Sequence, residues 1–347
     1  MKSNLVEWLR SPLDGSSLRL ESDVKIDGDV ISGRLVDGSG NQYPIKEGVP
    51  FFAEDSGRDD TFSFKWKLIG SSYGYEEKTR STRQNWYLER FGFHFRSQLL
   101  DFLREKKAIL DAGTGSGVDA GMFAESGTTV MAIDLSQDAA LATYRHLGGL
   151  PNVHILQADL NFLPFAPGTF DYISCDQVLH HTRNTEQSFS SLVKYLKEGG
   201  HLALYVYKRK SPIREFTDDY LRNYATEMTA EECYEFCRGV TLLGKALSDL
   251  KAEVSIPQDI PLLEIKSGRQ DVQRFFYWNV MKCFWNDDYD FITNVVINFD
   301  WYHPRYAWRH TPEEVCGWFK KQKLEIERMN IVESGIAALG RLSIKES

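Results

Sequence analysis

A glycine-rich turn is the segment of this chain best suited to hold a ligand. The run Ile109-Leu110-Asp111-Ala112-Gly113-Thr114-Gly115-Ser116-Gly117 has the pattern of a strand that enters a turn and opens a helix. Glycines let backbone approach a ligand closely, and a helix N-terminus offers free N–H donors. A dinucleotide-binding fingerprint would place its third glycine where this chain has Val118, which weakens a pyrophosphate interpretation.

Carboxylates follow later apolar runs. Asp134 ends the run Ala132-Ile133-Asp134-Leu135, about twenty residues past the turn, where an acid can accept hydrogen bonds from both hydroxyls of a ribose. Ala158-Asp159-Leu160 follows the next apolar run, and Cys175-Asp176-Gln177 follows the one after it. The position of Asp134 indicates a nucleoside-containing ligand without saying which one.

Histidines could supply a proton acceptor with a pKa near neutrality. His180 and His181 come just after the fourth apolar run of the central region. We expect one of the two to pack in the core or cap the following helix, and His181 to face a pocket. His303 and Tyr207 are the alternative candidates for a general base.

Strands and helices must position these groups. Short apolar runs alternate with helix-length segments over residues 108–207, which predicts a parallel sheet with helices on both faces. Residues 208–310 break this rhythm with a mostly helical stretch, and residues 311–347 resume it with a helix and two apolar strands. Residues 56–107 have a helical, aromatic-rich pattern and are expected to act as a lid segment.

The central motifs together resemble those of class I S-adenosylmethionine-dependent methyltransferases. The Asp-x-Gly-x-Gly-x-Gly turn, the segment from Leu163-Pro164-Phe165 to Phe170-Asp171, and the turn Leu196-Lys197-Glu198-Gly199-Gly200 occur in that family's order. The arrangement looks nearest to the branch that methylates ubiquinone and menaquinone precursors. The resemblance implies a Rossmann-like α/β fold, S-adenosylmethionine as cofactor and S-adenosylhomocysteine as product. It implies cofactor contacts from Asp111, Gly113, Thr114, Gly115, Gly117, Asp134, Leu135, Asp159, Leu160, Asp176 and Gln177, with Asp159 on the adenine amino group.

Residues 1–55 read as short strands broken by turns. They resemble a small zinc-ribbon-like module related to activators of tRNA and protein methyltransferases, because Tyr43-Pro44-Ile45 and Gly48-Val49-Pro50 keep its pattern. Tetrahedral zinc needs thiolate or imidazole ligands. We therefore expect a metal-free module acting as scaffold, lid or dimer contact, since the cysteine positions hold Ser11, Asp14, Val36 and Ser39.

Residues 208–310 are expected to cover an acceptor pocket. They include thirteen aromatic side chains between Phe275 and Trp308, which mostly pack against one another. An insertion after the fifth strand lies over the carboxyl edge of the sheet, where ligands of open α/β folds bind. The basic turn at Lys208 to Lys210 is either solvated or a pocket rim for an acidic acceptor. The candidate acceptor-binding residues are Arg209, Trp301, Tyr302, Arg305 and Tyr306, although Asp300 could instead hold His303 and Arg305 in a loop ion pair.

Composition narrows the function. A formal net charge of -8 offers no general attraction to nucleic acid or to anionic membranes. No apolar run reaches membrane-spanning length, and five cysteines form no paired framework, so we expect a cytoplasmic protein. The favoured function is methyl transfer to an O, N or C atom of a small molecule by in-line displacement. A tRNA, rRNA or protein methyltransferase and a non-catalytic scaffold remain alternatives, and a homodimer is left open.

Overall fold

The computed structural model describes residues 1–53, 60–69 and 75–344, and the chain divides into two compact units. Unit 1 comprises Met1–Arg58, Gly70–Tyr207 and His310–Ser347, and unit 2 comprises Asp59–Ile69 and Lys208–Arg309. The chain thus leaves unit 1 after Tyr207 and returns to it at His310. Within the described ranges, no helix is both long and apolar enough to cross a membrane.

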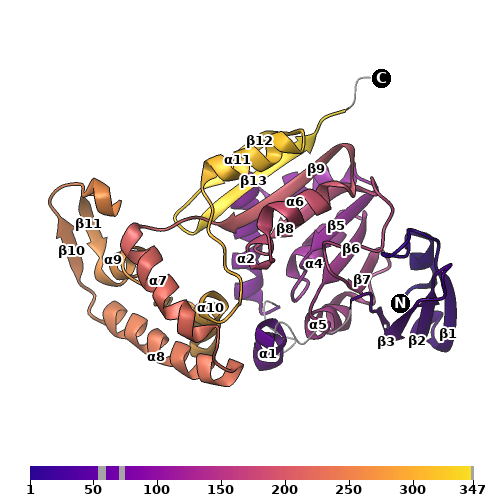
Figure 1. Ribbon diagram of the computed structural model, residues 1–347, viewed down its shortest axis with the longest axis horizontal. Coiled ribbons are helices and arrows are strands. Elements are labelled where there is room, and N and C mark those ends of the chain that lie inside the picture. The colour runs from indigo at the N-terminus through magenta and orange to yellow at the C-terminus, as the bar shows by residue number, and fades with distance from the viewer. Residues whose placement is uncertain (54–59, 70–74, 345–347) are drawn as a thin grey trace. The chain divides into compact units, whose positions relative to one another are not determined.

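Unit 1 is built on a seven-stranded sheet in the order β12-β13-β9-β8-β5-β6-β7 (Figure 1). Neighbours from β9 to β7 pair in parallel, whereas β13 is antiparallel to both β9 and β12. This order confirms the predicted Rossmann-like α/β sheet. The strands are β5 (Ala108–Ala112), β6 (Thr129–Asp134), β7 (Val153–Gln157), β8 (Phe170–Asp176), β9 (Leu196–Tyr207), β12 (Leu324–Ile331) and β13 (Gly335–Leu342).

Helices bury both faces of this sheet. Ile109 belongs to one apolar core and Leu110 to the other, because successive side chains of a strand point to opposite faces. One core includes side chains from α6 (Thr185–Val193) and α11 (Pro312–Lys321). The opposite core includes side chains from α2 (Glu77–Phe91), α3 (Arg96–Arg104), α4 (Val118–Ala124) and α5 (Gln137–Leu147).

The N-terminal module covers the β7 edge of the sheet. Its four antiparallel strands are β1 (Arg19–Ile26), β2 (Asp29–Val36), β3 (Gln42–Lys46) and β4 (Val49–Pro50), preceded by the 3-10 helix η1 (Ser3–Glu7). The Phe52 N–H donates to the Gln157 carbonyl at the end of β7 (2.9 Å), and the Arg10 N–H donates to the Pro164 carbonyl (2.9 Å). The module therefore satisfies backbone groups that an edge strand and the following loop would leave unpaired.

Hydrogen bonds join the two loops of this module where the sequence comparison places metal ligands. The Ser11 hydroxyl donates to Asp37 (2.9 Å), and the Ser39 hydroxyl donates to Asp14 (2.9 Å). Asp37 also accepts a bond from the Tyr43 hydroxyl (3.1 Å). These bonds can hold the loops without metal, while the kinship to zinc ribbons stays a prediction.

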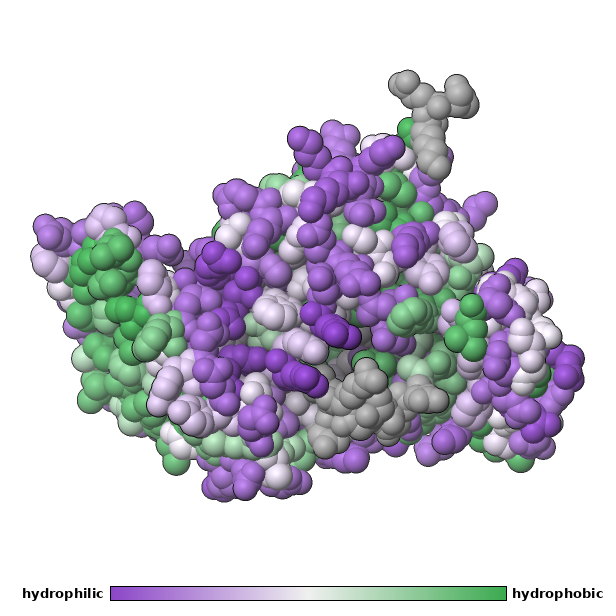
Figure 2. All heavy atoms as spheres, in the orientation of Figure 1, coloured by the Kyte–Doolittle hydropathy of each residue, from purple (hydrophilic) through white to green (hydrophobic). Residues whose placement is uncertain are grey.

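Unit 2 is mainly helical. It consists of α1 (Asp60–Ile69), α7 (Pro212–Ala225), α8 (Ala230–Asp249), α9 (Val272–Asn279) and α10 (Phe291–Tyr302), with the short hairpin β10 (Glu253–Ile256) and β11 (Gly268–Asp271) and the 3-10 helix η3 (Pro261–Leu263). The ring of Phe64 on α1 packs against Phe299 on α10, with centroids 5.5 Å apart. Apolar side chains gather on the surface over β10 and β11 (Figure 2).

The segment predicted as one lid over residues 56–107 is divided between the units. Helix α1 packs within unit 2, and its Lys65 pairs with Asp300 of α10 (2.5 Å). Helices α2 and α3 instead bury Phe91 and Leu99 in the core beneath the sheet. Residues 56–59 and 70–74 of that predicted segment lie outside the described residues.

Candidate cofactor-binding site

Four predicted carboxylates lie at, or just after, the carboxyl ends of neighbouring strands. Asp111 lies on β5, Asp134 ends β6, Asp176 ends β8, and Asp159 follows β7 by two residues. Strand β5 lies between β6 and β8, so the chain reverses its direction across the sheet beside β5. Open α/β sheets bind ligands in the crevice at such a reversal. Parallel strands therefore bring these acids to one edge.

The glycine turn is shaped by left-handed backbone. Gly113, Gly115 and Gly117 have φ values of 85°, 59° and 84°, a region that side chains with a Cβ adopt at a cost. A Cβ at position 113 would also lie 2.3 Å from Cγ2 of Val178. Thr114 is buried within the same turn, and its N–H donates to the Ile133 carbonyl (2.8 Å). The turn is therefore fixed against β6.

Asp134 is held by two backbone donors. The Gly115 N–H donates to Oδ2 (2.9 Å), and the Ser136 N–H donates to Oδ1 (2.9 Å). These bonds fix the carboxylate plane beside the turn. Each carboxylate oxygen can accept more than one hydrogen bond, so the same group can also receive two ribose hydroxyls.

Several carboxyl groups lie close together in a poorly solvated part of the site. Burial, reinforced by the neighbouring carboxylate of Asp119, raises the pKa of Asp111 to about 8. Burial also raises the pKa of Asp119 to about 6, while Arg83 opposes the rise and Asp176 adds to it. Carboxylates that face one another in a poorly solvated place resist ionisation. A cationic ligand would favour their charged forms.

Arg90 supplies a counter-charge that the sequence analysis missed. Its guanidinium on α2 pairs with Asp176 (2.5 Å), and both side chains are mostly buried. Asp119 was missed too, although it follows the glycine turn by only two residues, which was an available signal. No local pattern distinguishes Arg90 from the other charged residues of α2.

The site can accommodate S-adenosylmethionine. Three buried polar atoms, namely Oδ2 of Asp111, Oδ1 of Asp176 and Oγ of Ser116, have no hydrogen-bond partner within the described part of the chain. Buried polar atoms are usually paired, and a polar ligand can supply the missing partners. An ammonium and a sulfonium would also offset the charge of the acids. The donor set therefore fits this cofactor.

The remaining predicted cofactor residues differ in accessibility. Asp159 accepts bonds from the backbone and the side-chain amide of Asn161 (2.8 and 2.9 Å). Leu160 is buried in the apolar core, whereas Leu135 is 51% exposed and can offer apolar surface to a ligand. Gln177 is exposed with a φ of 63°, and its amide donates to Asp176 (3.2 Å).

Three of the four predicted catalytic residues lie together in unit 1. His180 and His181 belong to the 3-10 helix η2 (Leu179–His181) after β8, and Tyr207 ends β9. The ring of His180 stacks on Tyr207 with centroids 3.6 Å apart, and the His181 ring meets Tyr207 edge-on at 5.5 Å. His180 is fully buried, while His181 keeps some accessible surface.

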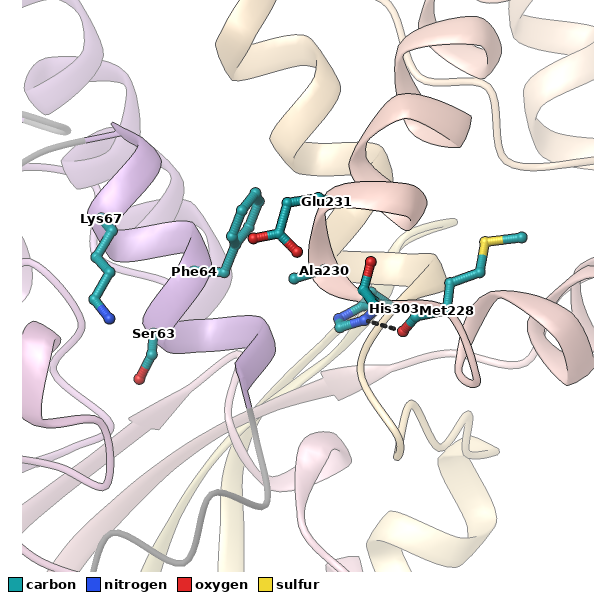
Figure 3. Close-up of a pocket in the computed structure, with 8 residues that line it drawn as sticks. Ser63, Phe64, Lys67, Met228, Ala230, Glu231 and His303 are labelled. Carbon is teal, nitrogen blue, oxygen red and sulfur yellow. Dashed lines mark hydrogen bonds between the residues drawn. The ribbon is translucent and has the colours of Figure 1, made fainter.

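The fourth predicted catalytic residue, His303, packs in unit 2. It faces a hollow of about 410 Å³ and contacts Met228 (Figure 3). Its Nδ1 lies 2.6 Å from the Thr61 hydroxyl, and its Nε2 lies 3.2 Å from the Met228 carbonyl. Both nitrogens are thus engaged, and a catalytic role for His303 stays a prediction. The hollow is lined by Ser63, Phe64, Lys67, Met228, Thr229, Ala230, Glu231 and His303.

Two predicted acceptor contacts are buried in unit 2. Trp301 is 2% and Tyr302 0% exposed, and the Tyr302 hydroxyl donates to the Lys282 carbonyl (2.8 Å). Their contact with an acceptor stays a prediction. Arg209 and Arg305 are exposed, and the Arg305 guanidinium lies 5.6 Å from the centre of the Tyr306 ring.

The central region also matches a known family. A family described as "Methyltransferase domain" matches residues 110–204, which contain the end of β5, the strands β6 to β8, most of β9 and all four carboxylates described above. Residues 110–204 are a class I S-adenosylmethionine-dependent methyltransferase domain. S-adenosylmethionine is accordingly the cofactor of this methyltransferase domain.

The matches between this chain and its relatives cover only part of each relative's length. The chain is 30% identical to the demethylmenaquinone methyltransferase of Clavibacter sepedonicus over 28% of this chain and 39% of that protein. It is 31% identical to the ubiquinone biosynthesis O-methyltransferase of Thiobacillus denitrificans over 27% of this chain and 41% of that protein. The solved 1,6-didemethyltoxoflavin-N1-methyltransferase of Burkholderia thailandensis is 12% identical over 93% of this chain and 100% of that chain, with a TM-score of 0.42. The chain spans between 25% and 41% of the first relatives that it matches.

Proposed function

We propose that this protein transfers the methyl group of S-adenosylmethionine to a small-molecule acceptor. The observation that carries the proposal is the group of buried acids around Asp111 at the reversal point of the methyltransferase domain, with polar atoms left unpaired. The bound cofactor supplies a methyl group already activated by its sulfonium. The protein's task is then to align the acceptor and exclude water.

Each residue of the site has a distinct role in this proposal. Asp134 orients the ribose because its carboxylate is fixed by two backbone donors. Asp111 and Asp176 hold the positively charged part of the cofactor. His181 accepts the acceptor's proton when the methylated atom is a hydroxyl or an amine, because it is the accessible member of the histidine pair. Tyr207 positions the pair through ring contacts.

The choice of a small-molecule acceptor rests on two supports. Two relatives are a demethylmenaquinone methyltransferase and a ubiquinone biosynthesis O-methyltransferase, although the matches cover only 39% and 41% of those proteins. The net charge of -8 disfavours RNA as acceptor, because nucleic-acid affinity depends on neutralising phosphates. A cap function for residues 208–310, covering the acceptor, belongs to the same proposal.

Binding should be tested first by calorimetry with S-adenosylhomocysteine. We expect saturable heat for the wild type, and a dissociation constant at least tenfold higher for Asp134→Asn, which loses carboxylate acceptors for two hydroxyls. Asp138→Asn is a matched control, because Asp138 lies four residues after Asp134, in the first turn of α5. Absence of heat with the wild-type protein would refute cofactor binding.

Turnover should be tested with labelled S-adenosylmethionine and three separate mixtures: small metabolites, total RNA and total protein. The proposal expects label in a small metabolite, and identification of that product by mass would name the acceptor. Label in RNA or protein would replace the proposal with the corresponding macromolecular activity. If the protein binds the cofactor but labels none of the three mixtures, the scaffold alternative gains support.

A further inference from the structure

The hairpin of unit 2 has open strand edges. Strands β10 and β11 form a two-stranded antiparallel sheet, which no other described strand joins. The Val272 N–H donates to the Ala252 carbonyl (2.9 Å). Because hydrogen-bonded pairs alternate along an antiparallel ladder, the backbone N–H and C=O groups of Glu253 and Ser255 point away from β11. Strand β11 continues directly into α9, whose N-terminus Asp271 caps, so β10 offers the freer edge for another strand.

Exposed apolar side chains lie near both ends of β10. Leu250, shortly before the strand, is 62% exposed, and Ile260 and Leu262, which follow the strand, are 39% and 86% exposed. Apolar side chains gather on the surface over this hairpin (Figure 2). Exposed apolar side chains that gather in one place indicate an interface. The partner should therefore offer a strand edge with apolar groups near both of its ends.

Charges on the hairpin are balanced. The acids Glu253 and Asp259 pair with Arg269 (2.7 Å) and Lys266 (2.9 Å) of the same hairpin. Anionic membranes and nucleic acids bind surfaces that carry an excess of lysine and arginine. This surface has no such excess, so it favours a partner whose charges are balanced too. A second copy of this chain has the same balanced charges, the same open edge and the same apolar ends.

We propose that two copies of this chain pair through β10, as antiparallel edge strands related by a two-fold axis. Such a pair brings the start of one strand to the end of the other, so that Leu250 of one copy lies near Ile260 and Leu262 of the second copy. The two hairpins then form one four-stranded sheet, which is more stable than an isolated hairpin. This dimer does not depend on the proposed function, because all the residues that carry it belong to unit 2.

Side chains along the edge select one register. With the axis at Val254, Glu253 of each copy lies opposite Ser255 of the other, and each of these two pairs exchanges two backbone hydrogen bonds. An axis at Glu253 would place two like charges opposite each other, which destabilises an antiparallel pair. An axis at Ser255 would place Glu253 opposite Pro257, which has no N–H to donate. The axis at Val254 is therefore the expected one.

Oxidative cross-linking of the full chain tests this register. The exposed Cys316 is first replaced by serine, since the other four cysteines are buried. Val254→Cys should then form a disulfide between two copies, because residues that face each other in a non-hydrogen-bonded pair have Cα atoms about 4.5 Å apart. Ser255→Cys is the matched control, because its two copies would be diagonal neighbours about 7–8 Å apart, too far for a disulfide. Cross-linking of neither variant, or of both equally, would overturn the proposal.

Sedimentation velocity over a range of protein concentrations measures the association itself. We expect concentration-dependent dimers of the wild type. Ser255→Pro should raise the dissociation constant about tenfold or more, because it removes an outward N–H from each copy and leaves the bonds between β10 and β11 in place. Leu262→Lys should weaken the dimer too, whereas the control Leu13→Lys, at a side chain 71% exposed in the N-terminal module, should not. Unchanged association of both hairpin variants would overturn the proposal.

Other outcomes identify a different occupant or separate the dimer from the cofactor assignment. A wild type that stays monomeric and sediments with phosphatidylcholine vesicles would show a lipid-binding surface and would overturn the dimer. Should Ser255→Pro fail to fold, Leu262→Lys provides the same measurement. The heat of S-adenosylhomocysteine binding should be equal in the wild type and Leu262→Lys. A dimer without cofactor binding would leave this proposal standing, and cofactor binding by a monomer would leave the proposed methyl transfer standing.

Discussion

The protonation of Asp111 should make the ligand-free protein less stable as the pH rises. Burial and the Asp119 carboxylate raise its pKa from the ordinary 3.8 to about 8. Between these values the unfolded chain has released the proton while the folded protein still holds it. Stability falls wherever the folded state binds more protons than the unfolded state. This contribution is therefore complete below pH 3.8 and is lost as the pH rises toward 8.

Replacement of Asp111 by asparagine measures this effect. The amide cannot ionise, so Asp111→Asn should match the wild type at acidic pH and exceed it in stability at pH 8. Each pKa unit corresponds to about 1.4 kcal/mol, which puts the difference at pH 8 on the order of 5 kcal/mol. Asp119→Asn should recover part of the same gain, because two interacting acids titrate as a pair.

Urea denaturation at several pH values from 5 to 8 provides the assay. Asp171→Asn is a control of opposite sign: hydrogen bonds from Lys197 and from two backbone N–H groups overcome partial burial and lower the pKa of Asp171. That variant should be less stable than the wild type by the same amount at every pH from 5 to 8, because Asp171 is ionised in both the folded and the unfolded state there. The loss should shrink only when the pH falls below 3.8. A constant difference between Asp111→Asn and the wild type from pH 5 to 8 would refute the reasoning. Cofactor should stabilise the wild type most at pH 8.

Three further perturbations test the site and its support. Gly113→Ala places a Cβ 2.3 Å from Val178 in left-handed backbone. It should lower the free energy of unfolding, measured by urea denaturation, by about 1–3 kcal/mol, and should abolish calorimetric binding of S-adenosylhomocysteine. A normal affinity would contradict the geometry of the turn. Arg90→Met leaves Asp176 buried without its cation. It should lower the free energy of unfolding by about 3–5 kcal/mol at pH 8 but by less at pH 5. Equal losses of this free energy at both pH values would argue against a charge effect. Asp37→Asn weakens hydrogen bonds within the N-terminal module and should lower the free energy of unfolding by about 1–3 kcal/mol. A chelator should leave the melting temperature of the wild type unchanged. A fall in that melting temperature would reveal a structural metal.

Local sequence patterns were sufficient to predict that the glycine turn and four acids lie at one edge of the sheet. The glycine turn and the acids at positions 111, 134, 159 and 176 each follow an apolar run that forms a strand. In a parallel sheet all such run ends meet at one edge. The spacing along the chain therefore carried the spatial relation, and the order of the strands confirmed it.

Only the tertiary structure decided which side chains are paired or buried. Arg90 meets Asp176 across 86 positions of sequence, and α1 joins the helices of unit 2 rather than α2 and α3. Trp301 was expected to contact an acceptor, and only the packing of α10 shows that its ring is buried in unit 2. Periodicity reports that a side chain is apolar or charged, but not which distant segment will cover it. Burial and pairing depend on contacts between remote segments, and these arise only when the chain has folded.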